Sequence, residues 1–346
     1  MTVTLDALRQ KYSAVILAYG ATTDRELGLA GEKTLKGVIP SRRIVEYYNG
    51  SLDMDLTPEE FDPEVNRHIG IIGNGNIACD ISRMFLKDPS EFRDSDTPEH
   101  VMQKLRKSQI HTVEIIGRRG ITQAAFTTKE IRELSLLQNL KTYMVKSEVE
   151  DSMTDASNTE MLERAISRRT KLLHESSEMI ESAEHYEDVL SRVNEKKLIL
   201  RFLRNPTELI PSENDPSRIG RVTLQRMQLE GEANKQRAIP RDDEGESALR
   251  NLNCDVLVKS IGYKSVEMEG VPFDHKRSVI PHEFGCVKDP ETGELDVGLY
   301  VAGWIKRGPV GIVDATLRDS IETFKMVKHH LECDIIPASE ATVEDV

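Results

Sequence analysis

The sequence predicts an α/β fold built from doubly wound parallel sheets in two domains. Three observations predict it. Short apolar runs rich in β-branched residues recur along the chain. One of these runs leads through a glycine turn into a helical pattern and then to another apolar run, which is the order of a βαβ unit. The chain has 346 residues, of which 38% are hydrophobic, and this is enough for two cores.

The first element is the apolar run at residues 12–20, which reads YSAVILAYG. Its length and β-branched content predict a buried parallel strand. The next strand is residues 68–72, followed by the turn at 73–78 and by apolar residues at helical spacing over 79–86. After a polar stretch, residues 112–117 form the following strand, which completes the βαβ unit.

The second half of the chain is less regular. Residues 146–197 contain no glycine or proline, and apolar residues recur there at helix-compatible intervals, so we expect one or two exposed helices. Strand-like runs follow at residues 198–203, 221–224 and 254–258, with a charged loop at 235–246 before the last of them. A glycine-rich block at 298–311 then precedes a final helix that runs to about Leu331.

The charge balance argues against polyanionic partners. A formal net charge of -13 repels nucleic acids and anionic membranes at long range, so any anion site must be local. No apolar run reaches the ~18–20 residues that would span a bilayer. Residues 1–12 do not have the composition of a signal peptide or presequence, so we expect no targeting segment in this chain.

Metal-binding patterns are missing from the sequence. The four cysteines are Cys79, Cys254, Cys286 and Cys333. They are widely spaced and include no C-x-x-C pair, so the sequence indicates neither a zinc site nor a redox disulfide. The nine histidines show no ligand spacing. We therefore expect no metal site.

The turn Gly73-x-Gly75-x-x-Ala78 suits a diphosphate. Gly73 allows a tight turn, Gly75 removes the Cβ that would block the anion, and Ala78 lets helix and strand approach closely. Backbone N–H groups and the helix dipole would then face the anion. The alternative is a turn without a ligand, because this motif occurs widely.

Two arginines, Arg118 and Arg119, end the second strand of the βαβ unit. In an NAD site this position holds a carboxylate, which would repel the 2′-phosphate of NADP. Two guanidiniums can grip that phosphate, so the pattern predicts NADP(H). A solvated basic pair is the alternative. The distance from Gly73 to Arg118 is more than twice the usual ~20 residues, so an inserted segment must fill it.

The late glycine block contains the chain's single tryptophan, Trp304, between an apolar strand and a helix start. Glycines permit close approach of a flat ligand, and an indole can cover an aromatic ring system. A core tryptophan followed by an ordinary loop is the alternative. No residue pair in the sequence indicates acid–base catalysis, so we expect no catalytic residue and no independent dehydrogenase site.

Taken in order, five segments resemble the adrenodoxin reductase family: YSAVILAYGA, GIIGNGNIACD, VEIIGRRG with AAFTTKEIREL, SIGYK, and GLYVAGWIKRGPVG. The resemblance runs over nearly the whole chain. It implies an oxidoreductase that transfers a hydride from NADPH to FAD and passes electrons singly to a [2Fe–2S] ferredoxin, in the mitochondrial matrix of animals and fungi.

The resemblance also implies site residues. It puts the NADP diphosphate on Asn74, Gly75, Asn76 and Ile77 and the 2′-phosphate on Arg118 and Arg119, and it makes Glu130 a coenzyme contact. It places four residues at the flavin and nicotinamide: Trp304, Gly311, Ile312 and Val313. A basic cluster would face an acidic ferredoxin, although a solvated helix face explains it equally well: Arg164, Arg168, Arg169 and Lys171.

One departure from the family pattern concerns FAD. The family begins with a strand, a G-x-G-P-A-G turn and a helix that hold the FAD diphosphate, and Met1 starts downstream of them. We therefore expect an NADP-binding domain, residues 28–252, inserted into an incomplete FAD-binding domain made of residues 1–27 and 253–346. The alternative function is an NADP(H)-binding module without turnover.

Overall fold

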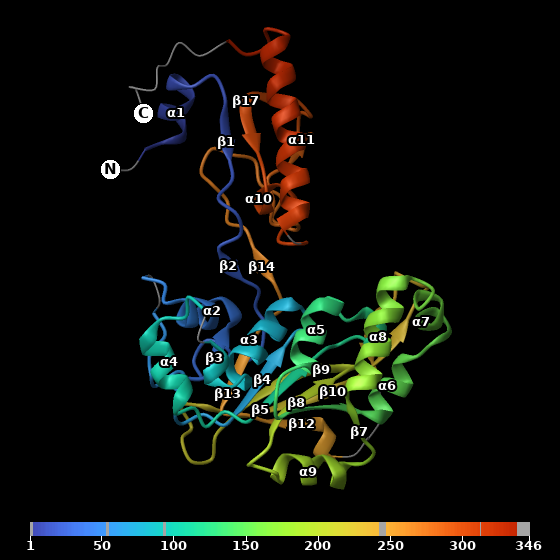
Figure 1. The fold of residues 1–346 in the computed structure, drawn as a ribbon. Helices are drawn as coiled ribbons and strands as arrows, with labels where there is room; N and C mark the ends of the chain where they lie inside the picture. The colour runs from blue at the N-terminus through green and yellow to red at the C-terminus, as the bar shows by residue number, and fades with distance from the viewer. Residues whose placement is uncertain (1–2, 53–54, 93–94, 242–246, 312, 338–346) are drawn as a thin grey trace. The chain divides into compact units, whose positions relative to one another are not determined.

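The computed structural model describes the chain except residues 1–2, 53–54, 93–94, 242–246, 312 and 338–346 (Figure 1). It divides into two compact units. Unit 2, Glu26–Ile261, is continuous in sequence and is inserted between the two segments of unit 1, Met1–Arg25 and Gly262–Val346. The expected insertion of one α/β unit into another is therefore present.

Unit 2 is organised around a parallel sheet, which has seven strands within the described residues. In spatial order they are β3 (Val38–Pro40), β13 (Val256–Lys259), β4 (His68–Ile72), β5 (Thr112–Ile116), β8 (Lys196–Arg201), β6 (Leu140–Val145) and β7 (Glu178–Ile180). The strand expected at residues 68–72 is found residue for residue, and that expected at 112–117 ends one residue earlier.

Helices cover one face of this sheet. Alternate side chains of its strands, such as Ile69, Ile71 and Val113, form the largest core with helix residues such as Ile81 and Leu134. The helices of unit 2 are α2 (Ser41–Asn49), α3 (Asn76–Leu86), α4 (Glu99–Arg106), α5 (Thr128–Ser135), α6 (Lys146–Ser152), α7 (Asp155–Glu160), α8 (Arg164–Ser176) and α9 (Ala183–Ser191), with short 3₁₀ turns at Pro89–Phe92, Ile121–Gln123 and Ser247–Arg250.

The opposite face is covered by an antiparallel layer and by α9. The antiparallel strands are β9 (Arg204–Pro211), β10 (Ile219–Glu230), β11 (Arg237–Pro240) and β12 (Asn251–Asn253). Val222 and Leu224 of β10 pack with Ile72, Ile116 and Leu257 of the parallel sheet. The mixed α/β class is therefore confirmed, with a β-layer standing where a second set of helices is usual in a doubly wound fold.

Unit 1 contains a smaller sheet in the order β1-β17-β16-β15, in which β1 pairs with β17 in parallel. A separate antiparallel pair joins β2 and β14. Its elements are α1 (Leu5–Lys11), β1 (Val15–Leu17), β2 (Thr23–Asp24), β14 (Tyr263–Lys264), β15 (His282–Glu283), β16 (Cys286–Lys288), β17 (Leu295–Val301), α10 (Trp304–Arg307) and α11 (Val313–Glu332).

Three expectations about local structure need correction. The run at residues 12–20 forms only the three-residue edge strand β1, in which Ile16 is 50% exposed. Residues 146–197 contain four helices and β7 rather than one or two helices. The second domain boundary does not fall at residue 253, because β13 pairs with both β3 and β4 and so belongs to the sheet of unit 2.

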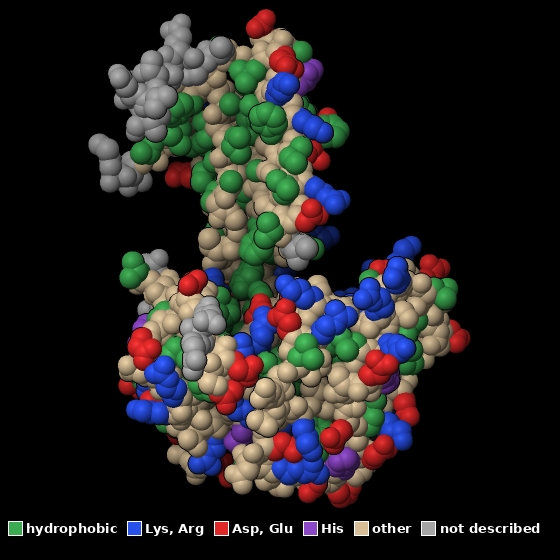
Figure 2. Space-filling model, viewed as in Figure 1, with side chains coloured by type: hydrophobic (Ala, Val, Ile, Leu, Met, Phe, Trp, Pro, Cys, Tyr) green, Lys and Arg blue, Asp and Glu red, His purple; other side chains and the backbone are tan. Residues whose placement is uncertain are grey.

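Three further observations complete the description. Successive turns of α11 carry exposed apolar side chains, namely Val313, Leu317, Ile321 and Phe324 (Figure 2). Among the described residues, no helix has the length and hydropathy needed to cross a bilayer. The described residues also contain no group of His, Cys, Asp and Glu side chains arranged to hold a metal ion.

Candidate functional site

The candidate site of unit 2 begins at the turn between β4 and α3. Gly73 has a φ of +113°, and a Cβ there would lie 2.1 Å from the backbone oxygen of Ser260, so only glycine fits. A Cβ on Gly75 would meet nothing within 4 Å. Because Gly75 caps α3 without a side-chain hydrogen bond, the N–H groups of Asn76 and Ile77 remain open to an anion, whereas that of Ala78 donates to the Gly75 carbonyl.

The turn is fixed to the tip of β5. The N–H of Gly73 donates to the Ile116 carbonyl at 2.8 Å. The Asn74 side chain occupies the space where a Cβ of Gly117 would stand, and its Nδ2 is buried without a hydrogen-bond partner. A buried amide donor without a partner is costly unless a ligand or water completes it. This arrangement therefore fits a ligand that accepts hydrogen bonds at the turn.

Both predicted arginines follow this strand tip. Arg118 and Arg119 come directly after Gly117, and both are exposed. The backbone around these arginines is held at the start of β9. The backbone N–H of Arg204 donates to the Gly117 carbonyl, and the backbone N–H of Leu203 donates to the Arg119 carbonyl. The strand tip is thus firmly placed while both guanidiniums remain available to a phosphate.

Glu130 lies close to the same turn. The Thr127 N–H at the N-cap of α5 donates to Oδ1 of Asn76 at 2.8 Å, which ties the start of α5 to the start of α3. In the first turn of α5, Glu130 accepts from Arg83 of α3 at 3.2 Å. Sequence reasoning missed Arg83, which also pairs with Asp80 and Glu133 and so orients Glu130.

A cavity of about 230 Å³ opens beside Arg119. It is also lined by Arg169, whose guanidinium donates to the carbonyls of Thr122 at 2.7 Å and Phe126 at 3.4 Å. Arg169 therefore braces the segment between Arg119 and α5. Burial lowers the pKa of Arg169 from its ordinary value, which is consistent with this inward position.

The other members of the predicted basic cluster point outward. Arg164, Arg168 and Lys171 are exposed on α8. Their spacing of four and three residues puts them on one face of that helix. Figure 2 shows Lys and Arg side chains at the surface in the region of α8. The expected cluster of four is thus reduced to three exposed residues.

The remaining predicted residues lie in unit 1. Trp304 begins α10, is partly buried, and stacks on Tyr263 with ring centroids 6.0 Å apart. The SIGYK segment that contains Tyr263 carried no predicted site residue, so this stacking partner was missed. Gly311 and Val313 lie exposed at the start of α11, and Ile312 lies outside the described residues. Hence the predicted residues form two groups, one in each unit.

Sequence relatives were found among curated proteins, whereas no family model matches the chain. The chain is 35% identical to NADPH:adrenodoxin oxidoreductase, mitochondrial, of Arabidopsis thaliana, with 98% of the chain and 68% of the relative covered. It is 34% identical to the human protein of the same name, with 97% of the chain and 64% of the relative covered. The chain therefore spans about two thirds of the length of these relatives.

A solved structure agrees with the sequence relatives. Mycobacterium tuberculosis FprA in complex with NADPH is 29% identical, with a TM-score of 0.79 over 97% of this chain and 68% of that one. Two independent comparisons thus reach the same group of oxidoreductases across almost the whole of the chain. The chain belongs to the NADPH:adrenodoxin oxidoreductase family.

Proposed function

We propose that the chain acts as an NADPH-dependent flavoprotein reductase, which passes electrons through FAD to a [2Fe–2S] ferredoxin. The observation that carries the proposal is the open glycine turn beside a fixed strand tip with two exposed arginines, in a chain related to NADPH:adrenodoxin oxidoreductases. When bound, the coenzymes supply hydride transfer followed by single-electron transfer. The protein's part is to bind and orient them and to exclude water.

In this proposal unit 2 is the NADPH-binding unit. The N–H groups from Asn74 to Ile77 face the diphosphate, and Nδ2 of Asn74 supplies a further donor. Arg118 and Arg119 hold the 2′-phosphate with charge-assisted hydrogen bonds. Glu130, oriented by Arg83, contacts the coenzyme. FprA, whose structure was solved with NADPH, supports this assignment.

Unit 1 would then be the FAD-binding part. Trp304 with its partner Tyr263 offers an aromatic surface to a flat ring system, and Gly311, Ile312 and Val313 follow as backbone contacts. The chain's domains in this proposal are those expected from the sequence, with the first boundary near residue 27 and the second moved from 253 to the end of unit 2.

The proposed partner is an acidic ferredoxin. The exposed face of α8 formed by Arg164, Arg168 and Lys171 is positive although the chain as a whole carries a net charge of -13. A local basic surface steers an acidic partner to one docking position. The relatives named mitochondrial support a mitochondrial location, and by the family resemblance we propose the matrix.

The alternative, a module that holds NADP(H) without turnover, gains no support from relatives that are named oxidoreductases. A visible absorption spectrum of the protein after incubation with FAD and desalting tests the choice. We expect flavin bands, and NADPH-dependent reduction of a ferredoxin. A colourless protein whose melting temperature rises with NADPH but not with FAD would favour the module instead.

A further inference from the structure

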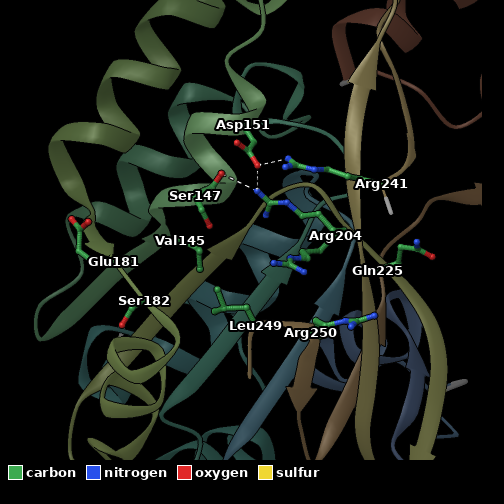
Figure 3. Close-up of a pocket in the computed structure, with 11 residues that line it drawn as sticks. Val145, Ser147, Asp151, Glu181, Ser182, Arg204, Gln225, Arg241, Leu249 and Arg250 are labelled. Carbon is green, nitrogen blue, oxygen red and sulfur yellow. Dashed lines mark hydrogen bonds and ion pairs between the residues drawn. The ribbon is translucent and has the colours of Figure 1, made fainter. Parts of the chain in front are cut away.

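A second cavity in unit 2 has no part in the proposed function. Its volume is about 270 Å³, and it opens where β6, β7 and β8 end, at the carboxyl edge of the parallel sheet. This edge is where α/β sheets usually bind ligands. Four arginines from separate segments line it, namely Arg204, Arg226, Arg241 and Arg250. Figure 3 labels three of them, Arg204, Arg241 and Arg250.

One buried carboxylate serves several of these guanidiniums. Glu148 has no solvent exposure and accepts from Arg201 at 2.8 Å, from Arg204 at 2.7 Å and from the Phe202 N–H at 2.9 Å. Its Oε1 also lies 3.7 Å from Nη1 of Arg226. Burial alone would raise the pKa of Glu148, but the arginines hold it below its ordinary value, so Glu148 is ionised.

A second carboxylate is shared in the same way. Asp151 accepts at 2.7 Å from both Arg226 and Arg241, and a dashed line in Figure 3 marks its hydrogen bond with Arg241. Glu181, which also lines the cavity, pairs with Lys146 at 2.7 Å. Each carboxylate of this region is therefore already paired with a basic side chain. The basic side chains around the cavity outnumber these carboxylates.

Several guanidinium donors remain without an acceptor. Nη1 of Arg226 is buried and has no hydrogen bond. Among the described residues, Nη1 and Nη2 of Arg204 donate to no group, although Arg204 is only 6% exposed, and Arg250 has neither a hydrogen bond nor an ion pair. Burial lowers the pKa of Arg204 even though Glu148 attracts its charge. The buried Nη1 of Arg226, together with the remaining donors of Arg204 and the exposed guanidinium of Arg250, calls for an anionic ligand.

We propose that this cavity binds a phosphate group, either as inorganic phosphate or as a small phosphomonoester. The arginines reach it from the β8–β9 junction, β10, the end of β11 and the 3₁₀ turn before β12, so donors approach from several directions. Donors in several planes suit a tetrahedral dianion better than a planar carboxylate. The volume exceeds that of one phosphate ion and leaves room for a small organic group.

The test must separate this cavity from the coenzyme site, which also attracts phosphate. Inorganic phosphate and phenyl phosphate are therefore titrated, at constant ionic strength, into the Arg118→Ala/Arg119→Ala variant of the full chain, by calorimetry and by melting temperature. We expect saturable binding that raises the melting temperature. Tighter binding of phenyl phosphate would identify an ester as the ligand, and equal binding would identify the free ion.

Variants on the same background locate the binding. Arg250→Ala removes an exposed guanidinium without disturbing the Glu148 network, and we expect it to weaken phosphate binding about tenfold or more. Arg241→Gln is a second, milder change. Arg237→Ala is the matched control, since Arg237 is exposed on β11, outside the cavity, and carries the same charge. Absence of saturable binding, or equal effects of Arg250→Ala and Arg237→Ala, would overturn the proposal.

Discussion

The side chain of Asn74 fills the space beside Gly117: a Cβ built on Gly117 would lie 2.5 Å from Nδ2 of Asn74. This contact couples the glycine turn after β4 to the strand tip that carries Arg118 and Arg119. The two parts of the proposed coenzyme site are thus positioned by each other, and the contact can be tested directly.

Gly117→Ala should destabilise unit 2 by about 1–3 kcal/mol, because the added methyl group overlaps the Asn74 amide. The backbone of Gly117 is not in the left-handed region, so the steric overlap is the expected cause. In an Asn74→Ala background the same change should cost less than about 0.5 kcal/mol. Urea unfolding of the four proteins of this cycle measures the coupling, and additive costs would refute it.

Gly73 and Gly75 should respond differently to alanine. Gly73→Ala should cost at least about 2 kcal/mol of folding free energy, because it adds a clash with Ser260 to an unfavourable φ. Gly75→Ala meets open space and should cost about 1 kcal/mol or less. It should nevertheless weaken NADPH binding about tenfold or more, since the methyl group stands where the diphosphate approaches. Unchanged NADPH affinity in folded Gly75→Ala would contradict the diphosphate assignment.

Removing the arginine pair tests coenzyme choice. Arg118→Ala/Arg119→Ala should weaken NADPH binding about tenfold or more per arginine, because charge-assisted hydrogen bonds to the 2′-phosphate are lost. NADH binding should change little. Titration calorimetry with both coenzymes gives the two affinities, and stability should be unaffected because both side chains are exposed. If both coenzymes lose affinity equally, the arginines do not read the 2′-phosphate.

The basic face of α8 should matter for the protein partner and not for the coenzyme. Arg164→Ala/Arg168→Ala should raise KM for an acidic ferredoxin, most clearly at low salt, and leave KM for NADPH unchanged. Arg169→Ala should raise KM for NADPH and leave KM for the ferredoxin unchanged, because Arg169 holds the carbonyls of Thr122 and Phe126 near Arg119. Steady-state kinetics with Arg237→Ala as the charge control checks both statements. A ferredoxin KM that does not respond to the α8 changes would remove this face from the docking surface.

His111 should make unit 2 sensitive to acid. Burial, with the nearby charges of Lys197 and His68, lowers the pKa of His111 from 6.5 to about 4. Between these values the unfolded chain binds a proton that the folded chain does not, so stability falls as pH falls from about 6.5 towards 4. Partial solvation limits the contribution to about 1 kcal/mol.

The variant His111→Gln should accordingly lose less stability than the parent between about pH 7 and about pH 5. His100→Gln, at an exposed position, should follow the parent curve. Urea unfolding at both pH values measures the difference. Parallel curves for the parent and His111→Gln would show that His111 does not contribute.

Local patterns in the sequence were enough to predict the strand, turn and helix around Gly73 and the strand that ends before Arg118. Each of these elements is set by hydrophobic period and by glycine at fixed positions. The edge position of β1 could not be predicted in this way, because burial of Ile16 depends on which strands lie beside it. For the same reason the sequence did not predict that β13 belongs to the sheet of unit 2, because its place between β3 and β4 is set by tertiary pairing.

The directions of side chains also could not be predicted from the sequence. Arg169 sits in a run of basic residues, and only the packing of α8 against the 3₁₀ turn at Ile121–Gln123 and the segment after it turns its guanidinium inward. The arginines of the second cavity come from four separate segments with no common spacing. A motif search has no signal to find in such a set, because the residues meet only after the sheet and its β-layer have formed.

The pairing of β1 with β17 joins two segments that lie on either side of unit 2 in the sequence. During synthesis β1 leaves the ribosome before unit 2, and its partner β17 emerges only after the whole of unit 2 has been translated. Unit 2, whose core uses one continuous segment, can complete its structure in the meantime. Until β17 emerges, the N–H and C=O groups of β1 lack this hydrogen-bonding partner, so the small sheet of unit 1 can form only after unit 2 has been synthesised.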